Sequence, residues 1–213
     1  MTYSVKEIFY TLQGEGANVG RPAVFCRFSG CNLWSGMDDQ RSDSLCPFCD
    51  TRFVGTDGVG GGRFETASAL AAGAANAWPV NGKPAIPKML VCTGGEPLLQ
   101  LDAAAIDAFH HEGFEIAVET NGTVPVPAGI DWVCVSPKLR AQCVVEAGDE
   151  LKLVFPQDGD DPRRYERLQF THFFLQPMDG PNRDSNVQLA VEYCLKHPRW
   201  RLSLQIHKLL GLR

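Results

Sequence analysis

The sequence lacks any apolar run of about 18 residues, the length that a membrane-spanning helix needs. Its first residues, MTYSVKEIFYTLQGEG, contain no basic segment followed by an apolar one, so we expect no secretory signal. Internal repeats and low-complexity tracts are absent as well. We therefore expect a cytoplasmic protein, with no membrane partner, that folds as a single domain over residues 1–213.

Positive charge is also scarce, since 20 Lys and Arg residues face 25 Asp and Glu residues. A general nucleic-acid binder needs a net basic surface to neutralise phosphates, so we expect no nucleic-acid partner. Small anionic substrates remain possible, because a few Arg or Lys side chains are enough to bind them. The apolar share of 44% is typical of a folded domain rather than of a disordered chain.

Cysteine, in contrast, is abundant, with eight residues. Disulfide frameworks belong to small secreted chains, and this chain fits neither description, so we expect free thiols. Cys26, Cys92, Cys134 and Cys194 lie among apolar neighbours, where cysteine behaves as a small hydrophobic residue. The role of Cys143 stays open.

Apolar runs alternate with helical patterns along the chain. We predict strands over residues 23–28, 88–92, 115–119, 131–136, 150–155, 172–176 and 201–206. We predict helices over residues 65–78, 101–113 and 184–197, a short helix at 161–168, and loops at 55–62 and 79–87. Asp102 is the expected N-cap of the second helix and Gly113 its stop. This order indicates an α/β fold with mainly parallel strands, and six or seven strands suit a partial (β/α) barrel.

Polar and reactive residues follow the ends of these predicted strands. They are Cys31, Thr93 to Glu96, Glu119 to Asn121, Ser136 to Lys138, Gln176 to Asp179, and His207. In parallel α/β folds the carboxyl ends of the strands form the reaction face. We therefore expect these groups to gather around one opening.

Three cysteines have the spacing of a metal site. Cys31, Cys46 and Cys49 form a C-x14-C-x2-C pattern, which supplies three thiolates and leaves one coordination position open. Structural zinc prefers four protein ligands, and no fourth Cys or His lies near this loop; His110 and His111 fall on a predicted helix. The pattern favours a [4Fe–4S] cluster with one iron free for an outside ligand, with zinc as the alternative.

A glycine-rich turn, Thr93–Pro97, follows the second predicted strand. Its glycines let the backbone approach a ligand closely, and the carboxylate of Glu96 can accept a hydrogen bond from a cation. Alone, such a turn is an ordinary strand-to-helix connection. Together with the cysteine loop, it indicates a specific site.

The cysteine loop and this turn resemble those of the radical S-adenosylmethionine superfamily. Phe48 occupies the aromatic position before the last cysteine, although the usual spacing is C-x3-C-x2-C and the first gap here is 14 residues. Nearly the whole chain is similar to one family in it, 7-carboxy-7-deazaguanine synthase. The matching stretches are EIFYTLQGEG, GRPAVFCRFSGCNLW, CPFCDT, VCTGGEPLLQ, ETNG, VSPK, LQPMDGP and RLSLQIHKLLG.

The resemblance implies a lyase that converts 6-carboxy-5,6,7,8-tetrahydropterin to 7-carboxy-7-deazaguanine with loss of ammonia, in queuosine and 7-deazapurine biosynthesis. It implies a modified radical SAM core, a [4Fe–4S] cluster, S-adenosylmethionine, Mg²⁺, a homodimer, and an electron donor such as flavodoxin or ferredoxin. Two alternatives remain: an activating enzyme that makes a glycyl radical on a protein partner, and a non-catalytic binding module stabilised by zinc.

The resemblance also assigns residues. Cys31, Cys46 and Cys49 would bind the cluster, and Thr51 the Mg²⁺ ion. The S-adenosylmethionine contacts would be Phe48, Cys49, Asp50, Gly95, Glu96, Glu119, Ser136, Pro137, Lys138, Gln176, Pro177, Met178 and Asp179. The substrate contacts would be Leu12, Gln13, Gly14, Glu15, Arg27, Thr93, His207 and Arg213.

Plainer interpretations exist for three of these residues. Thr51 would otherwise be a turn residue, Arg27 a salt-bridge partner, and His207 a structural or solvated side chain. The chain also departs from its relatives near its end, where Ile206 and Leu209 replace the Thr and Tyr that relatives often carry.

Overall fold

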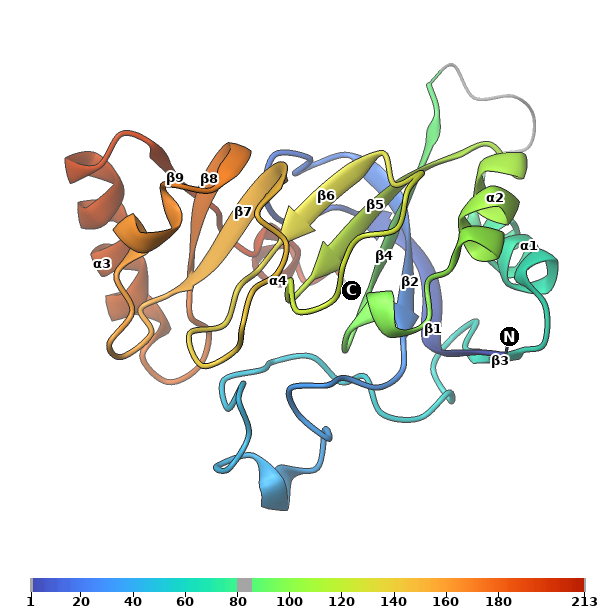
Figure 1. The fold of residues 1–213 in the computed structure, drawn as a ribbon, viewed down its shortest axis with the longest axis horizontal. Helices are drawn as coiled ribbons and strands as arrows, with labels where there is room; N and C mark the ends of the chain where they lie inside the picture. The colour runs from blue at the N-terminus through green and yellow to red at the C-terminus, as the bar shows by residue number, and fades with distance from the viewer. Residues whose placement is uncertain (1, 80–85, 213) are drawn as a thin grey trace.

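The structure, a computed structural model, describes residues 2–79 and 86–212 and forms one sheet of nine strands (Figure 1). The strands are β1 (Tyr3–Leu12), β2 (Pro22–Phe28), β3 (Gly62–Phe64), β4 (Lys88–Gly94), β5 (Phe114–Thr120), β6 (Trp132–Val135), β7 (Ala147–Phe155), β8 (Gln169–Pro177) and β9 (Trp200–Leu202). Their order is β3-β1-β2-β4-β5-β6-β7-β8-β9. All pairs from β2 to β9 are parallel, and β1 runs antiparallel to β2 and β3. The open, mainly parallel sheet confirms the predicted α/β class and fits a partial barrel.

Helices cover the two ends of the sheet. Helices α1 (Ala67–Ala77) and α2 (Ala103–His111) pack on the end that contains β1, β2 and β5, and α3 (Arg183–Lys196) packs on β8 and β9 (Figure 1). Short helical segments are η1 (Asp38–Gln40), η2 (Pro97–Leu99), η3 (Pro162–Tyr165) and α4 (Ile206–Leu209). The connections β5–β6 and β6–β7, which are fully described, contain no helix, so they add no helical layer to the middle of the sheet.

Local signals explain where the helices begin and end. The side chain of Thr66 accepts a hydrogen bond from the backbone nitrogen of Ala69, which caps α1. The Asp102 carboxylate accepts one from Ala105 at 2.9 Å, so the predicted N-cap of α2 is confirmed. Gly113 follows α2 with a φ of +79°, a conformation that ends a helix and that glycine adopts freely.

Two hydrophobic cores hold the sheet against its helices. One lies between α1, α2 and the strands β1 to β5, and it includes Leu90, Phe109 and Ile116; the other lies under α3 and includes Leu151 and Trp200. Burying one such aliphatic side chain contributes about 1.5–3 kcal/mol. Because successive strand residues face opposite sides, packing these residues under the helices turns the alternate residues toward the concave face.

The sequence-based boundaries need four corrections. β1 and β3 are strands that the pattern did not predict, and β3 begins at the end of the predicted loop 55–62. The predicted helix 161–168 is only the short segment η3. The predicted strand 201–206 ends at Leu202, because the chain turns there to bring Ile206 N to the carbonyl oxygen of Gly14 at 3.0 Å. The predicted loop 79–87 falls mostly on residues 80–85, which lie outside the described residues.

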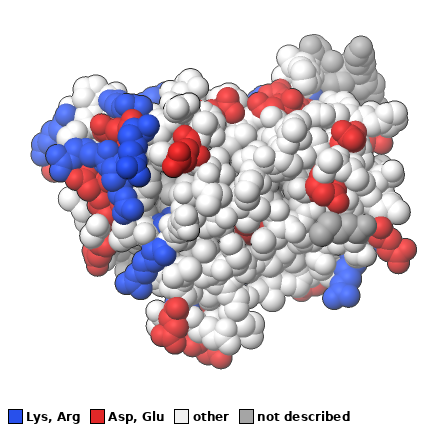
Figure 2. Space-filling view, viewed as in Figure 1, with Lys and Arg blue, Asp and Glu red and all other residues white. Residues whose placement is uncertain are grey.

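The remaining global features concern charge and membrane spans. Lys and Arg side chains gather over the end of the molecule formed by α3 (Figure 2). Acidic side chains lie at the tip of the protruding segment that contains η1, whose first residues are Asp38 and Asp39. Within residues 2–79 and 86–212, we find no helix with the length and apolarity needed to cross a bilayer.

Candidate functional site

A pocket of about 590 Å³ opens where the parallel strands end. Most of the residues assigned from the sequence line it: Leu12, Gln13, Gly14, Glu15, Arg27, Cys31, Cys46, Phe48, Cys49, Asp50, Thr51, Thr93, Gly95, Glu119, Ser136, Lys138, Gln176, Pro177, Met178, Asp179 and His207. The expected gathering around one opening is therefore observed, although the roles of these residues stay predictions.

Two assigned residues, Glu96 and Pro137, do not line the pocket in the part of the chain that the structure describes. Glu96 is fully buried, and its carboxylate accepts hydrogen bonds from Thr120 Oγ1 at 2.8 Å and from Asn121 N at 2.8 Å. Burial raises the pKa of Glu96. Pro137 separates two lining residues without contacting the pocket, and Arg213 lies outside the described residues.

The two glycines of the Thr93–Pro97 turn bring it against the cysteine segment. A Cβ on Gly95 would lie 2.0 Å from the carbonyl oxygen of Gly30 and 2.9 Å from the Cβ of Cys31. Gly94 also has a positive φ of +143°, which side chains rarely tolerate. Glycine is thus required at these two positions because neighbouring backbone atoms leave no room for a side chain. The sequence motif did not reveal this reason.

The three predicted cluster ligands share one wall of the pocket. A hydrogen bond between Cys46 and Cys49 is the main cause that lowers the pKa of Cys49 to about 6 and raises the pKa of Cys46. Burial raises the pKa of Cys31, whose sulfur accepts a hydrogen bond from Leu33 N at 3.4 Å. Cys49 is therefore the thiol that ionises first near neutral pH.

These thiols fit an iron–sulfur cluster by their chemistry. All eight cysteines are free, and four of them line the pocket: Cys31, Cys46 and Cys49 come from the cysteine loop, and Cys134 comes from β6. The loop thus offers three soft sulfur donors. Within the described residues, no three Cys, His, Asp or Glu side chains are already arranged around a metal position. Three thiolates without a fourth protein ligand suit a [4Fe–4S] cluster with one open iron better than a closed zinc site.

The long cysteine loop is ordered by local contacts. The Arg41 guanidinium lies 4.1 Å from the centre of the Trp34 ring and donates to the carbonyl oxygen of Cys49 at 2.8 Å. At the start of the loop, Asn32 bonds with Asn121 at 3.0 Å and with Thr123 at 2.8 Å. The 14-residue gap therefore forms a defined structure that connects the predicted cysteine ligands to the end of β5.

A lysine of the C-terminal helix α4 lies at the opening of the pocket and contacts two aspartates there. Lys208, in α4, contacts Asp50 at 2.6 Å and Asp179 at 2.5 Å. Burial alone would raise the pKa of Asp50, but Lys208 outweighs it and leaves that pKa below its usual value. Thr51 Oγ1 lies 3.5 Å from the Asp50 carboxylate, so two hard oxygen donors stand next to each other, as Mg²⁺ prefers.

A second lysine lies on the floor of the pocket. Lys152, in the middle of β7, contacts Glu15 at 2.5 Å and Glu119 at 3.4 Å. Glu119 also accepts hydrogen bonds from Gln13 at 3.2 Å and from Thr93 at 3.1 Å. Glu119 was predicted to contact the cofactor, yet two of its partners, Gln13 and Thr93, were predicted to contact the substrate.

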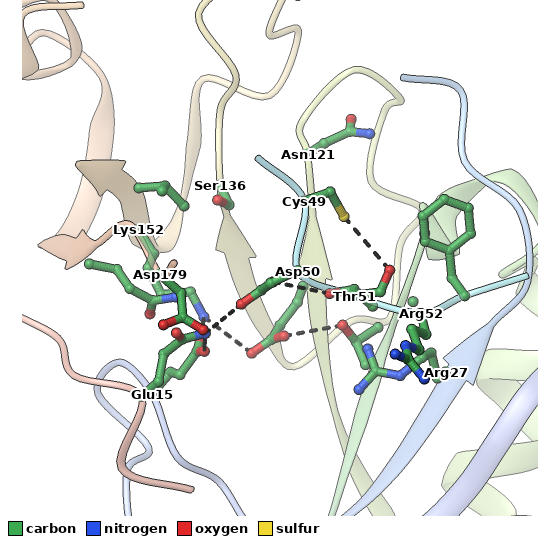
Figure 3. Close-up of a pocket in the computed structure, with 18 of the residues that line it drawn as sticks. Glu15, Arg27, Cys49, Asp50, Thr51, Arg52, Asn121, Ser136, Lys152 and Asp179 are labelled. Carbon is green, nitrogen blue, oxygen red and sulfur yellow. Dashed lines mark hydrogen bonds and ion pairs between the residues drawn. The ribbon is translucent and has the colours of Figure 1, made fainter. Parts of the chain in front are cut away.

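Cationic groups occupy another part of the pocket. In Figure 3, Arg27 and Arg52 lie at one side, and Glu15, Lys152 and Asp179 lie at the other, with Asp50 and Thr51 between them. Arg27 Nε donates to Glu7 at 2.8 Å, so the salt-bridge interpretation of Arg27 holds in this structure alongside its place in the pocket.

The His207 ring packs closely against the backbone of Gly14, in the predicted substrate-binding segment. A Cβ on Gly14 would lie 2.2 Å from His207 Nδ1, so glycine makes room for the ring. Next to it, Gln205 donates to Glu15 at 3.0 Å and to Asp50 at 3.1 Å. The C-terminal segment thereby joins the two sides of the opening.

Sequence reasoning missed several pocket residues. They include Arg52, Asn121, Lys152, Gln205 and Lys208. Lys152 had a usable signal, because a lysine in the apolar run ELKLVF is unexpected in a buried strand. Lys208 had none beyond its place beside His207.

Comparisons with known proteins find relatives along the whole chain. The chain is 63% identical to the 7-carboxy-7-deazaguanine synthase of Caulobacter vibrioides, 60% to that of Bordetella pertussis and 58% to that of Burkholderia multivorans, each over 212 residues and 100% of both chains. No protein-family profile matches the chain. The crystal structure of QueE from Escherichia coli has the same fold, with a TM-score of 0.66, 24% identity, and coverage of 96% of this chain and 94% of that one.

Proposed function

The chain belongs to the 7-carboxy-7-deazaguanine synthase family, and on that basis we propose that it converts 6-carboxy-5,6,7,8-tetrahydropterin to 7-carboxy-7-deazaguanine with loss of ammonia. It is a radical S-adenosylmethionine lyase of queuosine biosynthesis. The observation that carries the proposal is that one pocket joins the three thiols of the cysteine loop to a floor of carboxylate, amide and lysine side chains. Such a pocket suits a reaction that a bound cofactor starts and the protein directs.

The cysteine wall is the proposed cofactor side. Cys31, Cys46 and Cys49 would hold the cluster, and Phe48, Asp50, Gly95, Ser136, Lys138 and the segment 176–179 would surround S-adenosylmethionine. When bound, the reduced cluster and S-adenosylmethionine supply the radical that removes hydrogen from the pterin. Glu96 supports this side from behind, because it holds the backbone of Asn121 and the hydroxyl of Thr120.

The opposite side is the proposed substrate side. Arg27 suits a carboxylate, because its planar guanidinium can donate two parallel hydrogen bonds. Gln13 and Glu15 present the donors and acceptors that a pterin edge requires, and Thr93 and His207 complete the wall. We assign Mg²⁺ to Thr51, with Asp50 as the neighbouring oxygen donor.

Partners and location are further parts of the proposal. We propose a homodimer in the cytoplasm, with residues 1–213 as one radical SAM domain. A one-electron donor such as flavodoxin or ferredoxin would reduce the cluster. Family membership supports these assignments.

An anaerobic assay tests the function. Reconstituted protein is incubated with reductant, S-adenosylmethionine and the carboxytetrahydropterin, and the products are separated by chromatography. We expect 7-carboxy-7-deazaguanine and ammonia in equal amounts. Cleavage of S-adenosylmethionine without that acid would contradict the assigned substrate, and bound zinc without iron would support the binding module instead.

A further inference from the structure

Lys152 is a buried charge that the sequence motifs leave without a role. It lies in the middle of β7, faces the pocket floor, and contacts Glu15 and Glu119 at 2.5 Å and 3.4 Å. Cys134 and Glu150 face it as well, from β6 and from β7 itself. A buried ammonium is costly unless carboxylates compensate it, so this arrangement needs an explanation.

The contacts keep both members of the Lys152–Glu119 pair ionised. Burial alone would lower the pKa of Lys152, but the carboxylates of Glu119 and Glu15 outweigh it and hold that pKa above its usual value. Burial would raise the pKa of Glu119, but Lys152 and the bonds from Gln13 and Thr93 leave it below its usual value. A proton donor and a proton acceptor thus lie next to each other at the pocket floor.

The proposed reaction needs one of each. Substrate and product differ by one molecule of ammonia, and the six-membered ring of the substrate contracts to a five-membered ring. The whole conversion breaks two carbon–nitrogen and two carbon–hydrogen bonds and forms one carbon–carbon single bond, one ring double bond and two nitrogen–hydrogen bonds. Its last step, release of the amine from the contracted ring, breaks one carbon–hydrogen bond and one carbon–nitrogen bond. In that step the electron pair of the carbon–hydrogen bond becomes the ring double bond, and the carbon–nitrogen pair leaves with the nitrogen. One proton must therefore leave carbon, and one proton must reach the departing amine.

We propose that Glu119 and Lys152 form the acid–base couple that releases ammonia, with Glu119 accepting the proton from carbon and Lys152 donating a proton to the amine. Transfer of the proton from Glu119 to Lys152 across their 3.4 Å contact then restores both groups, so no further reactant is needed. Glu15 holds Lys152 in place from the other side. This inference rests on the proposed function.

Other cations of the pocket suit the donor role less well. Lys138 is engaged by the carbonyl and hydroxyl oxygens of Ser136 at 2.5 Å and 2.8 Å. Lys208 lies at the solvent-exposed opening between two aspartates. Arg27 does not release a proton at neutral pH. Lys152 is buried, lines the floor and adjoins a carboxylate that can return its proton.

The decisive variant is Lys152→Arg, which keeps the positive charge but removes the donor, because a guanidinium stays protonated. We expect formation of the deazaguanine acid to fall about 100-fold or more. Cleavage of S-adenosylmethionine and the Kd of the pterin for the cluster-free protein should change only a few-fold. Lys88→Arg, at the start of β4 and outside the pocket, is the matched control and should leave all three unchanged.

Two results would overturn the proposal. Product formation by Lys152→Arg within threefold of the unsubstituted enzyme would make Lys152 a structural charge only. Parallel loss of pterin binding and cofactor cleavage in a folded Lys152→Arg protein would make it a positioning residue. If this variant does not fold, Glu119→Gln decides: product formation should fall about 100-fold or more, and the residual rate should lack the acidic limb of the pH profile. A rate within threefold of the unsubstituted enzyme, or an unchanged acidic limb, overturns the couple.

Failure of this inference differs from failure of the proposed function. If the unsubstituted enzyme makes no deazaguanine acid, the function itself is wrong. If the unsubstituted enzyme makes the acid and the variants behave as it does, only the acid–base couple is wrong.

Discussion

Two lysines in this protein each bridge two carboxylates, yet their surroundings differ. The side chain of Lys152 is 6% exposed between Glu15 and Glu119, whereas that of Lys208 is 31% exposed between Asp50 and Asp179. The exposed lysine has the shorter pair of contacts, at 2.6 Å and 2.5 Å, against 2.5 Å and 3.4 Å for the buried one.

The lengths of these contacts therefore do not tell which lysine contributes more to the free energy of unfolding. Water and salt screen the charges around Lys208, and such exposed pairs contribute about 0–1 kcal/mol. Removing one partner of a buried pair leaves an uncompensated charge, which costs about 3–5 kcal/mol. The comparison teaches that the lysine at the floor fixes the charge state of the pocket, while the lysine at the opening fastens a segment.

The largest effect should follow from Lys152→Met. We expect the free energy of unfolding at neutral pH to fall by roughly 3–5 kcal/mol, because Glu15 and Glu119 then lose their buried counter-charge. Anaerobic denaturant unfolding of the metal-free protein measures it. A loss below about 1 kcal/mol would place Lys152 in the same class as an exposed pair.

Lowering the pH should reduce the difference in the free energy of unfolding between Lys152→Met and the unsubstituted protein. In the unsubstituted protein the pKa of Glu119 is lowered, so its stabilisation is present above the ordinary value of about 4.3 and is lost as pH falls through the folded pKa. In the variant, burial of Glu119 without Lys152 raises the pKa of Glu119. Protonation of Glu119 then removes the cost of its uncompensated buried charge as the pH falls. Denaturant unfolding between about pH 7 and pH 4 should show the two proteins converging; parallel curves would contradict this.

A smaller effect is expected from Lys208→Met. The unfolding free energy should fall by about 1 kcal/mol or less, because the charges are partly hydrated. The KM for the pterin should rise several-fold, since Lys208 fastens the segment that carries His207. Lys208→Arg should recover most of the binding. Equal losses of kcat and no change in KM would contradict a fastening role.

Salt should produce the smallest effect and separate the two lysines. Raising ionic strength to about 0.5 M shortens the screening length to a few ångströms and weakens exposed pairs most. The stability difference between Lys208→Met and the unsubstituted protein should shrink by a few tenths of a kcal/mol. The difference for Lys152→Met should stay constant, and a comparable decrease there would mean that the pocket floor is hydrated.

The sequence predicted what depends on local pattern. The cap at Asp102, the stop at Gly113 and the strand over residues 23–28 were all visible, because each needs only a few neighbouring residues. β1 was missed because its polar residues, such as Lys6 and Glu7, interrupt the apolar pattern.

The two lysine bridges depend instead on contacts between distant parts of the chain. Lys152 and Glu15 are 137 residues apart, and Lys208 and Asp50 are 158 residues apart. A single sequence carries no periodic signal for such pairs. The positions of polar residues after the predicted strands indicated which groups would lie around the opening. Only the structure shows which charged side chains form ion pairs there.

We propose that Cys31, Cys46 and Cys49 hold an iron–sulfur cluster, and the metal content of the protein decides this. Iron and acid-labile sulfide are measured in anaerobically reconstituted unsubstituted protein, in Cys46→Ala, and in Cys143→Ala as a control outside the pocket. We expect about four iron atoms per chain in the unsubstituted protein and the control, and loss of both iron and sulfide in Cys46→Ala. Full iron in Cys46→Ala, or zinc in place of iron in the unsubstituted protein, would contradict it.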